Sequence, residues 1–187
     1  MENNRSLSNP QESAGSDPRT KPQPYFTVGA VKFSLMSATT FGLYELYWLY
    51  KNWQVIRDHE QSRISPFWRT FFAPLWTFAM GRHFTAEANA QHVSLTLSVV
   101  PLGVLYLVLS ALWAVPDPYA LISLFAFVPL LPFDRAARLL DGNGQLAEPT
   151  HGRYSRLNIA WLIVGSLLLV LVIIGSFMSE SLEQQII

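Results

Sequence analysis

The stretch LNIAWLIVGSLLLVLVIIGSFM, residues 157–178, decides the fold class that we predict for this chain. Its 22 residues carry no charge, and as an α-helix they would extend about 33 Å. The hydrocarbon core of a bilayer is about 30 Å thick, so a helix of this length can cross it. A helix buried in a soluble protein is rarely so uniformly apolar. The stretch therefore predicts a transmembrane helix.

The residues on either side of this stretch predict its orientation. Arg153 and Arg156 precede it, whereas Glu180 and Glu183 follow it. Basic residues that flank transmembrane helices stay on the cytoplasmic side of the membrane. We therefore expect the C-terminus on the outer side.

Two further apolar stretches, 93–116 and 119–133, are predicted to form a hairpin across the membrane. The first is uncharged and long enough to cross, and Pro101 is expected to kink it. The second is shorter, about 22 Å if it is fully helical. The sequence PDP at 116–118 predicts the turn between the two stretches.

The N-terminal half contains two less regular candidates, 33–50 and 66–80. The first lies between Lys32 and Lys51, whose long side chains can reach opposite membrane surfaces. The second is rich in aromatic residues, which favour the membrane interface, but it contains Arg69 and a central proline. It can cross with its polar side against other helices, re-enter the membrane or lie in the interface.

Together these patterns predict an all-α fold, an integral membrane helical bundle with four or five membrane segments. We expect one membrane domain, 25–187, after a polar tail, 1–24, that is too poor in apolar residues to fold. Five crossings place the N-terminus inside, and four place it outside. Both arrangements put most basic residues inside. We favour five, because four would require the charged tail to cross the membrane.

Glu45 is the candidate functional residue in the first segment. On a helical wheel it shares a face with Ser37, Trp48 and Asn52, and polar residues in membranes face other helices. Arg69 is its expected partner, so we predict an intramembrane charge pair, Glu45 and Arg69. The pair is more simply explained by packing than by transport, because the site is shallow and no second acid accompanies it.

Few other residues suggest chemistry. His83, Glu87 and His92 resemble metal ligands, but His92 is nine residues from His83 and would point elsewhere on a helix. We expect no metal, no cofactor and no catalytic residue. The absence of cysteine excludes disulfides and thiolate chemistry. Thirteen basic and thirteen acidic residues give no net charge, so no nucleic-acid partner is expected.

The sequence TFGLYELYWLY, residues 40–50, resembles a T-x-G-x-Y-x-x-Y-W-x-Y motif. The motif is typical of a family of small, uncharacterised multi-pass proteins of the bacterial inner membrane, a domain of unknown function. The sequence ISPFWRTFFAP, residues 64–74, is similar to a second block in some of these proteins. The resemblance implies a multi-pass protein of the bacterial inner membrane, and it implies no activity.

Three functions are compatible with these observations. The first is a non-catalytic partner or scaffold in the bilayer, which binds another membrane protein or a second copy of itself. The second is a small solute or ion transporter, or a channel, that uses Glu45 and Arg69. The third is an enzyme acting on lipid, for which His83 and His92 are the only support. The sequence favours the first, because it contains few charges in apolar segments and no catalytic motif.

Overall fold

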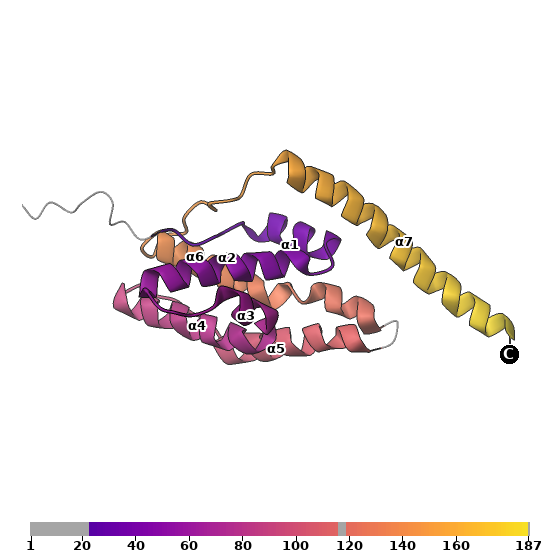
Figure 1. The fold of residues 1–187 in the computed structure, drawn as a ribbon, viewed down its shortest axis with the longest axis horizontal. Coiled ribbons are helices and arrows are strands. Elements are labelled where there is room, and N and C mark those ends of the chain that lie inside the picture. Colours follow the sequence, from indigo (N-terminus) through magenta and orange to yellow (C-terminus); the bar gives the residue numbers. More distant parts are fainter. Residues whose placement is uncertain (1–22, 116–118, 187) are drawn as a thin grey trace, which may run out of the picture.

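The computed structural model describes residues 23–115 and 119–186, and within these ranges the secondary structure is helical (Figure 1). The predicted all-α class is therefore confirmed for the described residues. The expected polar tail lies outside them, except for its last two positions. The helices, with 3₁₀ helices labelled η, are α1 Ala30–Thr39, α2 Leu43–Glu60, α3 Pro66–Phe71, α4 Ala73–Ala90, α5 Val99–Ala111, η3 Leu112–Ala114, η4 Tyr119–Phe125, η5 Val128–Leu130, α6 Leu131–Asp141 and α7 Arg156–Ile186.

The segment expected at 33–50 is a helical hairpin rather than one helix. α1 ends at Thr39, and α2 begins at Leu43 after a reversal of the chain (Figure 1). Phe41 and Gly42 have φ angles of 52° and 84°, in the left-handed region, and the Gly42 N–H donates to the Ser37 carbonyl at 3.0 Å. Glycine adopts this conformation without a steric penalty, so Gly42 permits the reversal.

The segment expected at 66–80 is also divided. Ser65 is in an extended conformation and Pro66 opens α3, as the sequence predicts. α3 ends at Phe71, and α4 begins at Ala73 with Pro74 in its first turn. Proline has no N–H to continue a helix, so the first helix stops and a second one starts.

The hairpin expected at 93–116 and 119–133 contains less α-helix than predicted. α5 covers 13 residues, about 20 Å, and the returning half of the hairpin consists of the 3₁₀ helices η4 and η5 followed by the start of α6. η4 and η5 nevertheless pack against α5. The tip at 116–118 lies outside the described residues.

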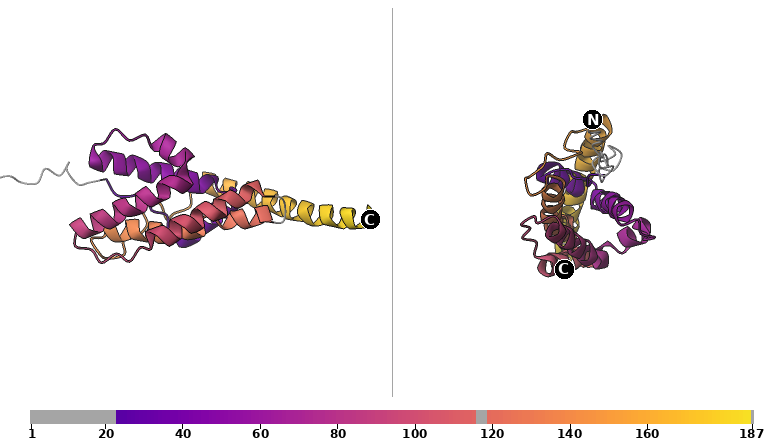
Figure 2. Two further views of the ribbon diagram at one scale, coloured as in Figure 1. Left: turned by 90° about the horizontal axis from the view of Figure 1, so that it is seen from below. Right: turned by 90° about the vertical axis from the view of Figure 1, so that its left-hand side faces the viewer.

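Of the residues described, only the Arg156–Gly175 part of α7 is both long and apolar enough to cross a membrane. A bundle with four or five membrane-spanning helices is therefore not confirmed. Only 6% of that part of α7 is buried, so it is not a core helix. α7 extends farthest beyond the other helices, at the end where the C-terminus lies (Figure 2).

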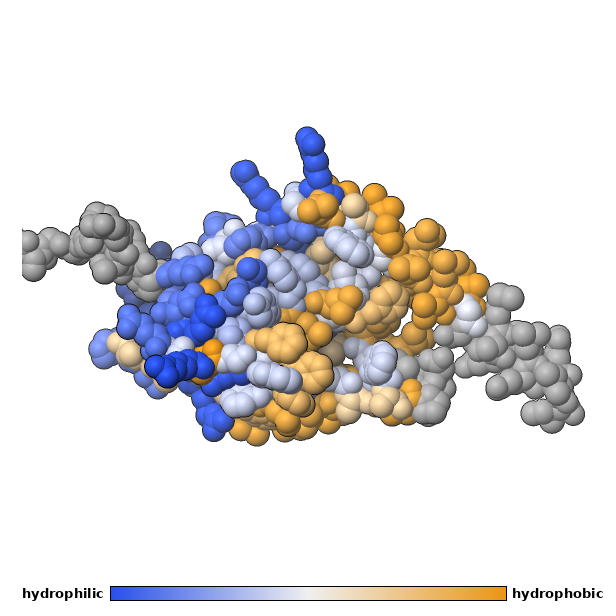
Figure 3. Space-filling model, in the orientation of Figure 1, coloured by the Kyte–Doolittle hydropathy of each residue, from blue (hydrophilic) through white to orange (hydrophobic). Residues whose placement is uncertain are grey.

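Hydrophobic and hydrophilic side chains gather at opposite ends of the molecule (Figure 3). The hydrophobic surface covers the end toward which α5 and α7 extend, and the hydrophilic surface covers the end where α2 and α4 finish. Aromatic side chains fill the core between the helices, including Phe33, Trp48, Trp53, Phe84 and Phe133, all at most 1% exposed. The molecule therefore has one end suited to lipid and one end suited to water.

Candidate functional site

The segment 23–29 runs extended through the hydrophilic end and is almost entirely buried from Tyr25 to Val28. Among the described residues it pairs with no strand; the His151 N–H donates to the Thr27 carbonyl at 2.8 Å, and side chains from other elements bind the rest of its backbone. The Tyr25 N–H donates to Asp141 Oδ1 at 3.0 Å, and the Thr27 N–H donates to Thr150 Oγ1 at 3.0 Å. Buried backbone groups need such partners, because an unpaired one costs free energy.

Asn52 and Asp134 bind the middle of this segment. Asn52 of α2 accepts the Phe26 N–H at 3.1 Å and donates to the Phe26 carbonyl at 3.0 Å, as a neighbouring strand would. Asp134 of α6 accepts three donors: the N–H groups of Val28 and Gly29 at 2.9 and 3.1 Å, and Trp48 Nε1 at 3.2 Å. Both side chains are buried, so these bonds fix the segment between α2 and α6.

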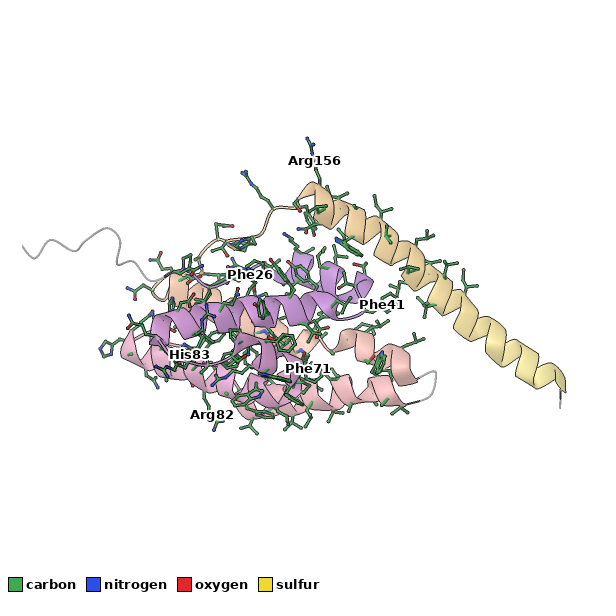
Figure 4. The ribbon with its side chains drawn as sticks, in the orientation of Figure 1. Phe26, Phe41, Phe71, Arg82, His83 and Arg156 are labelled. Carbon is green, nitrogen blue, oxygen red and sulfur yellow. The ribbon has the colours of Figure 1, made fainter. Side chains whose placement is uncertain are left out.

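Four side chains from three elements form a polar cluster at the start of this segment. His83 Nδ1 lies 2.8 Å from Glu60 Oε1, and His83 Nε2 lies 3.4 Å from Glu87 Oε2. The Tyr25 hydroxyl donates to Glu87 and lies 3.2 Å from His83 Nε2. Figure 4 shows His83 near the hydrophilic end of the molecule. The cluster joins the N-terminal segment to the end of α2 and to α4.

The pKa values in the cluster favour the charged imidazolium and carboxylate. Burial alone would lower the pKa of His83, but hydrogen bonds and charges from Glu87 and Glu60 raise it above its ordinary value. Burial alone would raise the pKa of Glu87, but hydrogen bonds from His83 and Tyr25 lower it. Burial also raises the pKa of Tyr25, which keeps the phenol neutral. Both imidazole nitrogens face carboxylates, so these contacts link α4 to the end of α2.

Glu45 and Arg69, the predicted charge pair, contact different partners. Glu45 is 3% exposed and faces the Tyr106 hydroxyl of α5. The Arg69 guanidinium lies over the rings of Trp53 and Trp76, 4.4 and 4.5 Å from their centroids. The face of an aromatic ring attracts a cation, so these two rings can hold the Arg69 guanidinium without the help of a carboxylate. Within the described part of the chain, no salt bridge joins Glu45 to Arg69.

His92 lies apart from the cluster around His83. It is exposed in the turn after α4, with a φ angle of 56°. Across residues 23–115 and 119–186, no three histidine or acidic side chains are placed to hold a metal ion. The two histidines therefore do not combine into one site.

Sequence reasoning missed most residues that bind the N-terminal segment. It placed Asn52 on the inward face of its helix, and that face is buried at Glu45, Trp48 and Asn52. It did not single out Asp134 or Thr150. One signal was available, because Asp134 directly follows an apolar stretch and precedes two alanines that face the core. The N-terminal segment that Asp134 and Thr150 bind, however, is more than 100 positions away in the sequence.

Comparisons with known proteins give no further guide to this site. No protein-family model, curated protein or solved structure matches the chain. The resemblance of residues 40–50 to a membrane-protein motif therefore stays a prediction.

Proposed function

We propose that this protein is an integral membrane protein that acts without catalysis, as a partner or scaffold in the bilayer. Its hydrophobic end lies in the hydrocarbon core, and its hydrophilic end, with the cluster around His83, lies in water. The observation that carries the proposal is the exposure of apolar side chains on α7, where Leu157, Trp161 and Ile163 are each at least 60% exposed. Large exposed apolar patches on proteins mark contacts with membranes or other proteins.

The aromatic side chains of α3 support this placement. Phe67, Trp68 and Phe71 are each 58–65% exposed. Phe71 lies midway along the body of the molecule (Figure 4), between the hydrophilic and hydrophobic ends. Aromatic side chains concentrate at the boundary between lipid and water. The resemblance to multi-pass proteins suggests the bacterial inner membrane as the location.

Membrane extraction tests the proposal. Membranes from cells that express the full chain are washed with alkaline carbonate, which removes peripheral proteins. We expect the chain to remain with the membranes and to dissolve only in detergent. Recovery of a folded monomer in buffer without detergent or lipid would overturn the proposal.

A second candidate function, proton or ion transport, is favoured by the position of Glu45. This buried carboxyl lies toward the hydrophobic end, close to the turn at Gly42. It faces the Tyr106 hydroxyl, and ionisable residues within membranes often serve transport. Proteoliposomes with Glu45→Gln should lose flux relative to the unmodified chain if it is a transporter. Flux that is absent from both would eliminate transport of the ion tested.

A further inference from the structure

Two cavities adjoin where α7 leaves the rest of the molecule. One has a volume of about 830 Å³, and the polar residues of its lining include Lys32, Arg153 and Ser155. The other has a volume of about 380 Å³ and is lined largely by apolar residues of α1, α2 and α7. Tyr44, Tyr47 and Asn158 line both, so the two cavities lie next to each other.

The polar cavity carries positive charge. Its lining contains Lys32 and Arg153, opposed by one carboxylate, Glu148. Lys32 is 5% exposed and donates to the carbonyls of His151 and Arg153 at 2.7 Å each. An ammonium has three N–H donors, so two of those of Lys32 are used within the protein.

The pKa of His151 reports the same positive potential. This imidazole lines the polar cavity, and its pKa is lowered first by burial and then by the charges of Lys32 and Lys51. Neighbouring positive charges disfavour the imidazolium, so they lower the pKa of His151 beyond the effect of burial. An anion would be attracted to this region.

The apolar cavity is a groove between α7 and the hairpin of α1 and α2. Met36 and Leu43 line one side, and Trp161, Val164 and Leu168 line the other. The α7 residues belong to the part of that helix that is long enough to cross a membrane. α7 runs toward the hydrophobic end (Figures 1 and 3), and the groove follows it from Asn158, which also lines the polar cavity, to Leu168.

We propose that these two cavities bind one phospholipid with an anionic headgroup. The headgroup lies in the polar cavity near Lys32 and Arg153, and an acyl chain lies in the groove beside Trp161. A charged cavity next to an apolar groove matches the two parts of such a lipid. Both volumes lie in the range of about 300–1,000 Å³ that is usual for small-molecule sites. The inference rests on the proposed residence in a membrane.

Arg153 and Arg156 provide a matched pair of variants for the test. Arg153 lines the polar cavity, whereas Arg156 projects outward from the start of α7 (Figure 4). The full chain is purified in detergent, and binding of phosphatidylglycerol and of zwitterionic phosphatidylcholine is measured by native mass spectrometry. We expect one phosphatidylglycerol per chain, bound about fivefold more weakly by Arg153→Gln and unchanged by Arg156→Gln.

The outcomes separate this inference from the proposed function. Equal loss of binding in both variants would indicate attraction to the surface charge and would overturn the site. Equal affinity for the two lipids would overturn the role of the anionic headgroup. Inorganic phosphate is added as a competitor, and displacement of the lipid by millimolar phosphate would show that the groove contributes nothing. Carbonate extraction of each variant is measured in parallel, so that a failure of membrane residence is seen on its own.

Discussion

At the scale of single residues, Asp134 determines how the N-terminal segment is held. Its Oδ1 accepts from Val28 and Trp48, and its Oδ2 accepts from Gly29. Asp134→Asn replaces one acceptor by an N–H group, which then faces a backbone N–H. We expect the free energy of unfolding in detergent to fall by about 1–3 kcal/mol, because a buried donor loses its partner. Asp58→Asn is the control, since Asp58 is exposed and pairs with its neighbour Arg57. Equal thermal midpoints for the two variants would contradict this role.

His83 makes stability depend on pH. Its pKa is raised in the folded chain above the ordinary 6.5, so the stabilisation it gives is fully present below pH 6.5 and is lost as pH rises through the higher folded value. Glu87 affects stability at acidic pH instead. Because its pKa is lowered in the folded chain, the stabilisation that it gives is present above its ordinary pKa of 4.5 and is lost as the pH falls below that value. We expect the thermal midpoint to fall as the pH is raised above 6.5, and we expect His83→Gln to reduce this dependence. His92→Gln, in an exposed turn, should retain the full dependence; a loss there would argue against the cluster.

At the scale of elements, the sequence predicted where helices can form better than where they stop. The start of α3 at Pro66 is confirmed, because a local signal, an extended residue followed by proline, determines it. The reversal at Gly42 lies within 33–50, which the sequence predicts as one continuous membrane segment. A positive φ angle leaves no trace in the hydropathy of the sequence. A helical hairpin and a single membrane-crossing helix therefore have the same hydropathy pattern. Packing of α1 against α2 and α6 decides between them.

The crossing of α7 over α1 depends on a glycine. A Cβ added at Gly165 would lie 2.1 Å from the Thr39 carbonyl oxygen, a backbone atom that cannot rotate away. We expect Gly165→Ala to separate the helices and to lower the free energy of unfolding by about 1–3 kcal/mol, the usual cost of overpacking. Gly175→Ala is the matched control, because nothing lies within 4 Å of its added Cβ. A thermal midpoint in detergent that is equally high for both variants would show that α7 does not rest on α1.

At the scale of the whole molecule, contacts between distant segments bring four parts of the chain to one end. The Gln23 carbonyl lies 2.7 Å from His59 Nε2 at the end of α2, and Tyr25 binds both Glu87 and Asp141. The candidate charge pair was predicted from one helical wheel, which cannot show such contacts. The residues of the cluster around His83 come from positions up to 62 apart, and no local pattern joins them.

This arrangement predicts a membrane topology that differs from both expected alternatives. Gln23, Gln61, Gln91 and Asn143 are exposed and lie next to the contacts that define the hydrophilic end. The chain has no native cysteine, so single cysteines at these positions can be labelled with a membrane-impermeant thiol reagent. We expect all four to react from the same side of the membrane. Four crossings would place Gln23 opposite Gln61, and five would place Gln61 opposite Gln91, so either pattern of labelling would exclude the hairpin of α1 and α2.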